Sequence, residues 1–566
     1  MSQSNPEFDV IIVGAGAAGC VLAGRLSEIS TRRVLLIEAG PDAPPEHEHP
    51  DIRDSFPVSL GNQSFIWPNL IAEVGADPGG GRPRASRPFS QGFGVGGGSN
   101  IQGMLAVRGI PEDYDEWRHE GAIGWDWNGV LPYFRKLEHD LDFNGPLHGS
   151  SGPIPIRRVT SWSPFAQAVA GAIERRGFRR YRDYNGEFEE GLYPLPMANL
   201  PERRVSASMG YLGADVRRRP NLTLLPDTRI LTLLFENRRC QGVCVMTGAT
   251  RRQIRAPEVI LTCGALQTPA VLMRSGVGPA AHLRSLGITV VNDAPGVGQN
   301  LQNHPKVQDV AVHLPRAVRQ PRALHTLAQN CLRYSSNVRD CGPRDMFLCC
   351  LNKTSWHALG KTIGAIAVVV HKPYSKGTVE LANADPLTPP KIRFNTLGDP
   401  RDYERLVGGL KLVLDILDDP AVTGHRHQAF LPQGKVVARL SRRTTRNRLE
   451  ARAIAALFEV GPLRKRLLRD LELDVTHLKS SDAMLRAIVH QRVELSRHVC
   501  GTCRMGTAND SMAVLDPMGN VRGIEGVRVA DASVFPVITR ANTHIPVLMV
   551  AEKMADEVKA AWQRAQ

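Results

Sequence analysis

The hydrophobic pattern of the first forty residues predicts a strand, a helix and a second strand. Residues 10–13 are a continuous apolar run, which is typical of a strand buried on both faces of a parallel sheet. Residues 20–26 then place apolar side chains at the spacing of one helical face, and residues 34–37 form a second apolar run that ends at Glu38. This order favours an α/β unit with a parallel sheet.

The glycines between the first strand and the helix fit a binding site for a dinucleotide. Gly14 would make the tight turn, Gly16 would let a pyrophosphate approach the backbone, and Gly19 would let helix and strand pack closely. The helix would begin near Ala17 and Ala18, where free amide groups can donate hydrogen bonds to phosphates. The pattern alone also permits a glycine-rich turn that binds nothing.

Glu38 strengthens the dinucleotide interpretation. It lies 19 residues after Gly19, where an acid can bind a ribose hydroxyl group, and an acid there disfavours the phosphorylated ribose of NADP. Because the two strands, the glycines, the helix and the acid occur in register, we expect a bound dinucleotide. This motif does not separate FAD from NAD.

The composition is that of an ordinary globular protein. The 566 residues would fill roughly three or four domain-sized units, with 42% hydrophobic and 22% charged residues. The ten cysteines are scattered, so we expect reduced, buried thiols rather than a disulfide scaffold. No apolar run reaches the length of a membrane span, and residues 1–10 do not resemble a signal peptide, so we expect a cytoplasmic protein.

Basic residues are in excess, with a formal net charge of +14. This charge permits nucleic acid, an anionic membrane surface or an acidic substrate as partner. Half of it falls in residues 435–473, where eleven Lys or Arg face four Asp or Glu and apolar residues recur at helical spacing. Such a basic amphipathic segment suits peripheral contact with the inner membrane surface, contact with a partner, or a solvated face of the fold.

A second glycine-rich stretch, residues 92–109, leads into the apolar residues 104–107. Together with the N-terminal motif it resembles the first signature of the glucose–methanol–choline (GMC) oxidoreductase family. Further segments resemble other motifs of that family and follow in the family's order: residues 264–278, 295–305, 375–379, 498–506, 527–533 and 541–546.

The resemblance implies FAD rather than NAD, and an α/β (α+β overall) architecture. A Rossmann-like FAD-binding domain would be assembled from residues 1–155, 205–315 and 490–566. Residues 156–204 and 316–489 would form a substrate domain on an antiparallel sheet covered by helices, with the basic stretch as an insertion.

The resemblance also implies which residues contact the cofactor. Beyond the N-terminal motif, these are Ala39, Trp67, Val95, Gly97, Gln102, Gly103, Met104, Leu105, Ile230, Gly264, Asp531, Ala532 and Ile545. Two positions depart from the family pattern. Position 102 is usually Asn or His, and members that attach the flavin covalently carry a histidine where this chain has Ile101, so we expect non-covalent FAD.

Two of the 17 histidines, His498 and His544, lie inside family motifs that face the flavin across the substrate. A neutral histidine suits removal of a hydroxyl proton, because its pKa lies near working pH. We expect His498 to be the general base and His544 to bind the substrate oxygen. Arg497 would pair with an acidic substrate group, depress the pKa of His498, or point away.

Cys500 and Cys503 form a CxxC without a second pair, so we expect no metal and no disulfide there. The residues predict an FAD-dependent oxidation of a CH–OH group, with a primary alcohol as substrate and oxygen or a quinone-like compound as acceptor. A lyase of the same fold that uses FAD only structurally is an alternative. A basic nucleic-acid-binding protein is a remote one, since no nucleic-acid module is visible.

Overall fold

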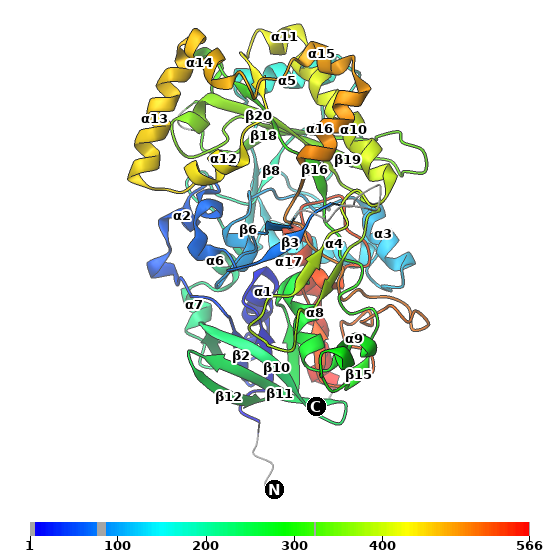
Figure 1. Ribbon diagram of the computed structural model, residues 1–566. Helices are drawn as coiled ribbons and strands as arrows, with labels where there is room; N and C mark the ends of the chain where they lie inside the picture. Colours follow the sequence, from blue (N-terminus) through cyan, green and yellow to red (C-terminus); the bar gives the residue numbers. More distant parts are fainter. Residues whose placement is uncertain (1–5, 76–85, 322–323, 565–566) are drawn as a thin grey trace.

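A computed structural model describes residues 6–75, 86–321 and 324–564 of the chain (Figure 1). Residues 1–5 and 565–566, which we expected to belong to the FAD-binding domain, lie outside these ranges. In the described part, no helix is long and apolar enough to cross a membrane. All ten cysteines are free thiols, and seven of them are buried.

A five-stranded parallel sheet forms the lower half of the molecule in Figure 1. Its strand order is β25 (Val527–Val529), β13 (Glu258–Leu261), β1 (Val10–Val13), β2 (Val34–Ile37) and β9 (Leu222–Leu225). Helix α1 (Ala17–Leu26) follows β1, as the apolar spacing predicts. The C-terminal helix α17 (His544–Arg564) packs beside it, and the core of this half is continuous between them.

The glycines of the N-terminal motif have the geometry that their spacing predicts. Gly14 has a φ of +104°, a turn conformation that favours glycine. A Cβ atom at Gly19 would lie 1.9 Å from the carbonyl oxygen of Gly14, so only glycine allows this close packing of helix and strand. A Cβ atom at Gly16 would meet nothing closer than 3.9 Å, which leaves the backbone open to a ligand.

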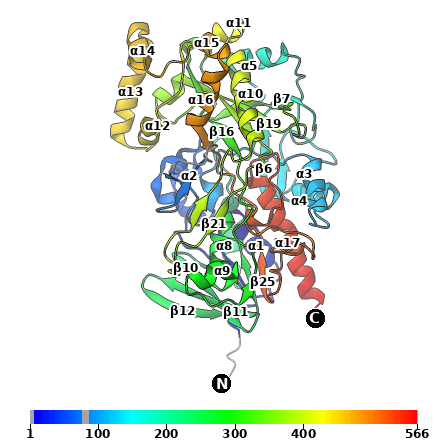
Figure 2. The same ribbon diagram turned by 45° about the vertical axis from the view of Figure 1, so that its right-hand side comes forward.

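An antiparallel eight-stranded sheet lies in the upper half (Figures 1 and 2). Its main path is β23 (Ala429–Phe430), β17 (Val310–His313), β20 (Ile363–Val370), β19 (Met346–Leu351), β18 (Ala328–Tyr334) and β7 (Gly191–Pro194), with β16 (Pro305–Val307) and β24 (Val493–Leu495) attached. Helices α5 (Pro164–Glu174), α10 (Pro400–Leu417), α15 (Val475–Lys479) and α16 (Asp482–Arg492) cover one face.

Side chains of the central strands alternate between two cores. Leu348 of β19 and Val368 of β20 pack beneath the covering helices, whereas their neighbours Phe347 and Val369 pack with Met104 on the opposite face. Both faces of this sheet are therefore buried, and the second face lies against the glycine-rich segment of the lower half.

Several strands depart from the expected domain boundaries. β16, β17 and β24 belong to the eight-stranded sheet, although their residues lie in segments expected for the FAD-binding domain. Conversely, β21 (Thr378–Glu380) and β22 (Lys391–Arg393), expected in the substrate domain, form a small sheet with β3 (Ile71–Glu73) and β4 (Ser86–Pro88). Strand pairing across long sequence separations decides these memberships.

The remaining strands form smaller sheets around the lower half. β10 (Thr228–Glu236), β11 (Arg239–Thr247) and β12 (Thr250–Arg255) make an antiparallel sheet. β5 (Glu138–Asp140), β6 (Ile154–Arg158) and β8 (Pro196–Met197) make a mixed sheet, and β14 (Val277–Gly278) pairs β15 (Asn292–Asp293). Short helices α3 (Pro111–His119), α4 (Trp127–Leu137), α6 (Ala207–Tyr211), α7 (Ala214–Arg217), α8 (Gly264–Arg274) and α9 (Ala280–Ser285) lie between them.

Candidate active site

Glu38 ties the two glycine-rich segments together. Its carboxylate accepts hydrogen bonds from the backbone amides of Ala15 (2.9 Å), Gly40 (2.9 Å) and Gly94 (3.2 Å). Burial raises the pKa of this carboxyl group, and the amide hydrogen bonds oppose that rise. A carboxylate offers about four acceptor positions, so these three bonds leave room for a ribose hydroxyl.

The segment at residues 92–104 packs directly on the N-terminal motif. The amide of Gly96 donates to the carbonyl of Ala15 over 2.7 Å, and a Cβ atom at Gly97 would lie 2.9 Å from the Cα of Gly16. Val95 lies between them in the core. The two segments that the sequence singles out, about 80 residues apart, thus form one cradle.

Helix α1 begins at this cradle with free backbone amides. Its N-cap is Gly16, which has no side chain to satisfy them, and its first turn, with Ala17 and Ala18, contains no acid. The amides at such a helix start favour an anion such as a pyrophosphate.

The other predicted cofactor residues lie around the cradle. Asp531 accepts hydrogen bonds from the amides of Gly264 (2.9 Å) and Ser533 (2.8 Å), which joins the start of α8 to the turn at Ala532. Trp67 packs edge-on against Phe93 and under the guanidinium of Arg229. Ile230 and Ile545 are buried, and Ala39 directly follows Glu38. Gly103 lies next to Leu105, and Leu105 packs against the buried cluster that contains Met104 and Phe347.

Gln102 and Met104 form a constrained turn. The Oε1 atom of Gln102 accepts a hydrogen bond from the backbone amide of Met104. Met104 is fully buried and has a positive φ of 65°. The Nε2 atom of Gln102 is buried without a partner, as are Nη2 of the buried Arg204 and Nε2 of His544. Unpaired buried donors are costly unless a ligand satisfies them, so these atoms fit an electron-rich cofactor group.

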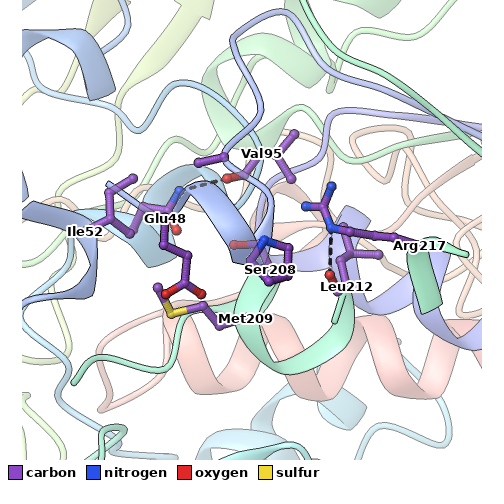
Figure 3. A pocket seen from close by; sticks show the side chains of 10 residues that line it. Glu48, Ile52, Val95, Ser208, Met209, Leu212 and Arg217 are labelled. Carbon is purple, nitrogen blue, oxygen red and sulfur yellow. Dashed lines mark hydrogen bonds between the residues drawn. The ribbon is translucent and has the colours of Figure 1, made fainter. Parts of the chain in front are cut away.

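A hollow beside the cradle is lined by Val95, Glu48, Ser208, Met209 and Arg217 (Figure 3). Its edges are held by the bond from Arg217 Nε to the carbonyl of Leu212 and by the ion pair between Arg217 and Asp42. It has room for little more than roughly one water molecule, so it adjoins the cradle without being a ligand site itself.

His498 lies in a chain of hydrogen bonds that sets which of its nitrogens carries the proton. Its Nδ1 atom lies 2.8 Å from Nδ1 of His304, whose Nε2 lies 3.0 Å from the carbonyl oxygen of Thr539. A carbonyl only accepts, so Nε2 of His304 carries the proton and its Nδ1 accepts. His498 must therefore donate from Nδ1, which leaves its Nε2 atom as an unprotonated acceptor.

That nitrogen accepts a hydrogen bond from Asn542. The Nδ2 atom of Asn542 lies 2.8 Å from Nε2 of His498. Among the described residues His498 and His544 share no hydrogen bond, and His544 lies instead at the start of α17, where the charge of Arg204 acts on it. The sequence interpretation missed Asn542, His304 and Arg204, although Asn542 and His304 lie inside the motifs already quoted.

Burial and positive charge keep the histidines of the site neutral. The pKa of His498 lies well below its ordinary value because of burial first, and then because of His304, Arg497 and Lys306. Burial also lowers the pKa of His544, to about 4, and holds that of His304 well below its usual range. Neutral imidazole is the form that can accept a proton.

Comparison with known proteins shows the family of this chain. The model of the GMC oxidoreductase family matches in two parts, over residues 8–306 and 373–551. The chain is 42% identical to a 5-(hydroxymethyl)furfural oxidase of Methylovorus sp. (strain MP688), covering 97% of this chain and 98% of that protein. It is 32% identical to an oxygen-dependent choline dehydrogenase of Sinorhizobium fredii, covering 98% and 95%.

Among solved structures, pyridoxine 4-oxidase from Mesorbium loti superposes with a TM-score of 0.80 at 26% identity, covering 98% of this chain and 99% of that one. The fold and these relatives show an FAD-dependent oxidoreductase that acts on alcohols. The chain belongs to the GMC oxidoreductase family, as its motifs predict.

Proposed function

We propose that this enzyme oxidises neutral or anionic aromatic primary alcohols, with oxygen as the electron acceptor. The observation that carries the proposal is the hydrogen-bond chain from Thr539 through His304 and His498 to Asn542, which presents an unprotonated nitrogen. A substrate hydroxyl group that replaces this direct contact between His498 and Asn542 would donate to the imidazole and accept from the amide. When bound, FAD would accept the hydride from the alcohol carbon.

The surroundings of His498 support an aromatic substrate. Phe347 stacks on His371 with ring centroids 4.6 Å apart, and His371 lies 5.0 Å from His304. Phe347, Val369 and Met104 belong to one buried apolar cluster between the sheet and the glycine-rich segment. The 42% identical relative is named as an oxidase of a furan compound that carries a hydroxymethyl group, which is an alcohol of the same chemical kind.

The charges around His498 disfavour a cationic substrate such as choline. After burial and His304, the neighbours that lower its pKa are Arg497 and Lys306, and both carry a positive charge. A quaternary ammonium group beside them would be repelled. This observation separates the proposed substrate class from that of the choline-oxidising relatives.

The test is a panel of alcohols assayed for hydrogen peroxide release and, without oxygen, for bleaching of the flavin absorbance. We expect benzylic and furanic alcohols to bleach the flavin and to release peroxide in air, and choline to do neither. Dye reduction without peroxide would instead identify a quinone-like acceptor, and turnover without bleaching would identify the lyase alternative. Acid precipitation should release the flavin, since Ile101 provides no covalent attachment.

Asn542 and His544 should differ in what their loss affects. Asn542→Ala removes a hydrogen bond to the proposed base, so we expect kcat to fall roughly tenfold or more while flavin content stays normal. His544→Ala removes a buried nitrogen on which the charge of Arg204 acts, so we expect weaker FAD retention. Steady-state kinetics and the absorbance ratio of flavin to protein distinguish the two. Equal loss of kcat with full flavin in both variants would contradict this division.

Arg497 should set the acidic limit of activity. Its side chain is accessible to water, yet desolvation lowers the pKa of its guanidinium, and its charge lowers the pKa of His498. A base with a lowered pKa stays unprotonated into more acidic solution, so kcat/KM should stay level down to below pH 6.5. Arg497→Met should move the acidic limb to higher pH. The matched control is Arg492→Met, an exposed arginine on the same segment, which should leave the profile unchanged.

A further inference from the structure

Three helices near residue 450 project at the outer edge of the upper half: α12 (Gly434–Leu440), α13 (Thr445–Glu459) and α14 (Gly461–Leu468). Figures 1 and 2 both show α13 and α14 on the outside of the molecule, with no other element on their outer side. They include most of the basic stretch that the sequence singles out, and they are independent of the active site described above.

The inner sides of these helices are firmly attached. Ala451, Ala455 and Phe458 of α13 and Leu468 of α14 pack in one buried cluster against the eight-stranded sheet. Arg443, between α12 and α13, pairs with Asp51 over 3.1 Å in the FAD-binding half. The fold therefore accounts for the inner faces and leaves the outer faces to be explained.

The outer face of α13 is apolar as well. Leu449, Ala453, Ala456 and Val460 recur at intervals of four, three and four residues, which places them on one side of the helix, opposite the buried side. All are exposed, and the exposed fraction of Leu449 is 59%. Of fourteen large exposed hydrophobic side chains in the described residues, seven lie between 436 and 467: Val436, Val437, Leu449, Leu457, Val460, Leu463 and Leu467.

Unpaired cations flank this apolar row. Arg446, Arg448 and Arg452 of α13 and Lys465 and Arg466 of α14 are exposed, and none forms an ion pair with any residue in the described part of the chain. By contrast Arg439 pairs with Glu450, and Arg464 is buried against the carbonyl of Phe458. We call the exposed side chains of α12, α13 and α14 the outer helical surface.

We propose that the outer helical surface docks this enzyme on an anionic lipid membrane. Helices that expose leucines between arginines and lysines lie in the interface of a bilayer, with the apolar side chains among the acyl chains and the cations near lipid phosphates. A bilayer accepts apolar groups that stand out from the protein, as these do. Its anionic lipids also supply negative charge, which balances the net charge of +7 on residues 435–473.

Charge complementarity also argues against other occupants. A symmetric contact between two copies of this chain would place the same unpaired arginines against each other, and like charges at close range repel. An acidic protein would satisfy the cations, but the leucines here lie on the outer sides of helices rather than in a groove that shapes a partner's anchor residues.

The test is co-sedimentation of the FAD-loaded enzyme with vesicles of pure phosphatidylcholine and of phosphatidylcholine with 30–50% phosphatidylglycerol, a range of roughly the anionic content that attracts basic segments. We expect binding to the anionic vesicles only, weakened by salt. The double variant Arg446→Gln/Arg452→Gln should bind roughly fivefold more weakly for each charge removed. Leu463→Gln/Leu467→Gln should weaken binding at least roughly tenfold.

Matched controls come from a distant strand. Arg251 and Arg252 are exposed on β12 at the other end of the molecule, so Arg251→Gln/Arg252→Gln should bind vesicles like the parent. Equal weakening in this control, equal binding to neutral vesicles, or no binding at low salt would overturn the proposal. A dimer in analytical ultracentrifugation that Leu463→Gln/Leu467→Gln abolishes would identify a second copy instead. Turnover of soluble alcohols should be unchanged in all these variants.

Discussion

His498→Ala should lower turnover by roughly 10²–10⁴-fold while the protein retains its flavin. The reason is that Nε2 of His498 is the unprotonated nitrogen of the His304–His498 pair that faces Asn542, so its removal leaves neither histidine nitrogen there to take the hydroxyl proton. The measurement is anaerobic flavin reduction by a rapidly oxidised alcohol in a stopped-flow instrument. This experiment isolates the oxidation of the alcohol from the later reaction with oxygen.

The control for this variant is His490→Ala, which replaces an exposed histidine on α16. It should reduce its flavin at the parental rate. A near-parental rate in His498→Ala would remove His498 from the role of base. If added imidazole restores the rate of flavin reduction in His498→Ala, proton transfer at this position is supported, because a purely structural defect does not respond to a soluble base.

Arg158→Met should destabilise the fold by about 3–5 kcal/mol, the usual cost of leaving buried charges unpaired. Arg158 is buried, binds Asp140 and contacts Asp183 over 2.9 Å. His148 completes the group, with its ring nitrogens 3.0 Å from Asp140 and 2.8 Å from Asp183. Urea unfolding at neutral pH measures the loss. Arg157→Met, on the neighbouring position of the same strand and without an ion pair, is the control.

The pH dependence of this network follows from its pKa shifts. Burial lowers the pKa of His148, but hydrogen bonds to Asp140, Asp183 and Glu138 outweigh that effect and raise it to about 10. Stabilisation by this group is therefore complete below about pH 6.5 and is lost as the pH rises through about 10. The pKa of Asp140 is lowered from its ordinary value of 3.8. The difference in the free energy of unfolding between Arg158→Met and the parent should therefore narrow only as the pH falls below 3.8.

The same network gives cationic partners to side chains that have the spacing of metal ligands. Glu138, Asp140 and His148 lie close enough to hold an ion. However, Arg108 pairs with Glu138 over 2.6 Å, and Arg158 and protonated His148 serve the other carboxylates. Three cations thus match the three carboxylates Glu138, Asp140 and Asp183. No property of the sequence pattern indicated this cluster.

Residues that are close in the sequence were predictable because local geometry relates them. The strand at 10–13, the turn at Gly14 and the packing at Gly19 depend on periodicity and on the absence of a Cβ atom, both of which the sequence displays. Glu38 was predicted as an acid that binds the cofactor because its spacing from Gly19 is visible in the sequence. Its three amide partners were not, because Gly94 reaches it only through the packing of a distant loop.

Residues that are far apart required the tertiary structure. His304 and His498 are 194 positions apart, and they meet because β16 pairs with β24 in a register that sets Pro305 opposite Leu495. A shift of that register by one residue would turn each side chain to the other face of the sheet. The pairing with Asn542 likewise depends on where α17 begins, since the helix starts at His544 and leaves Asn542 in the preceding loop.

The sequence by itself determined the fold class, the family, the cofactor and the histidine to examine first. These rest on motifs whose residues act through their own backbone and on periodicities of a few residues. The tertiary structure decided the partner and the tautomer of that histidine, the balance of the buried charges and the exposure of the apolar row on α13. Each depends on which distant atoms come within a few ångströms, and that distance is set only when the whole chain has folded.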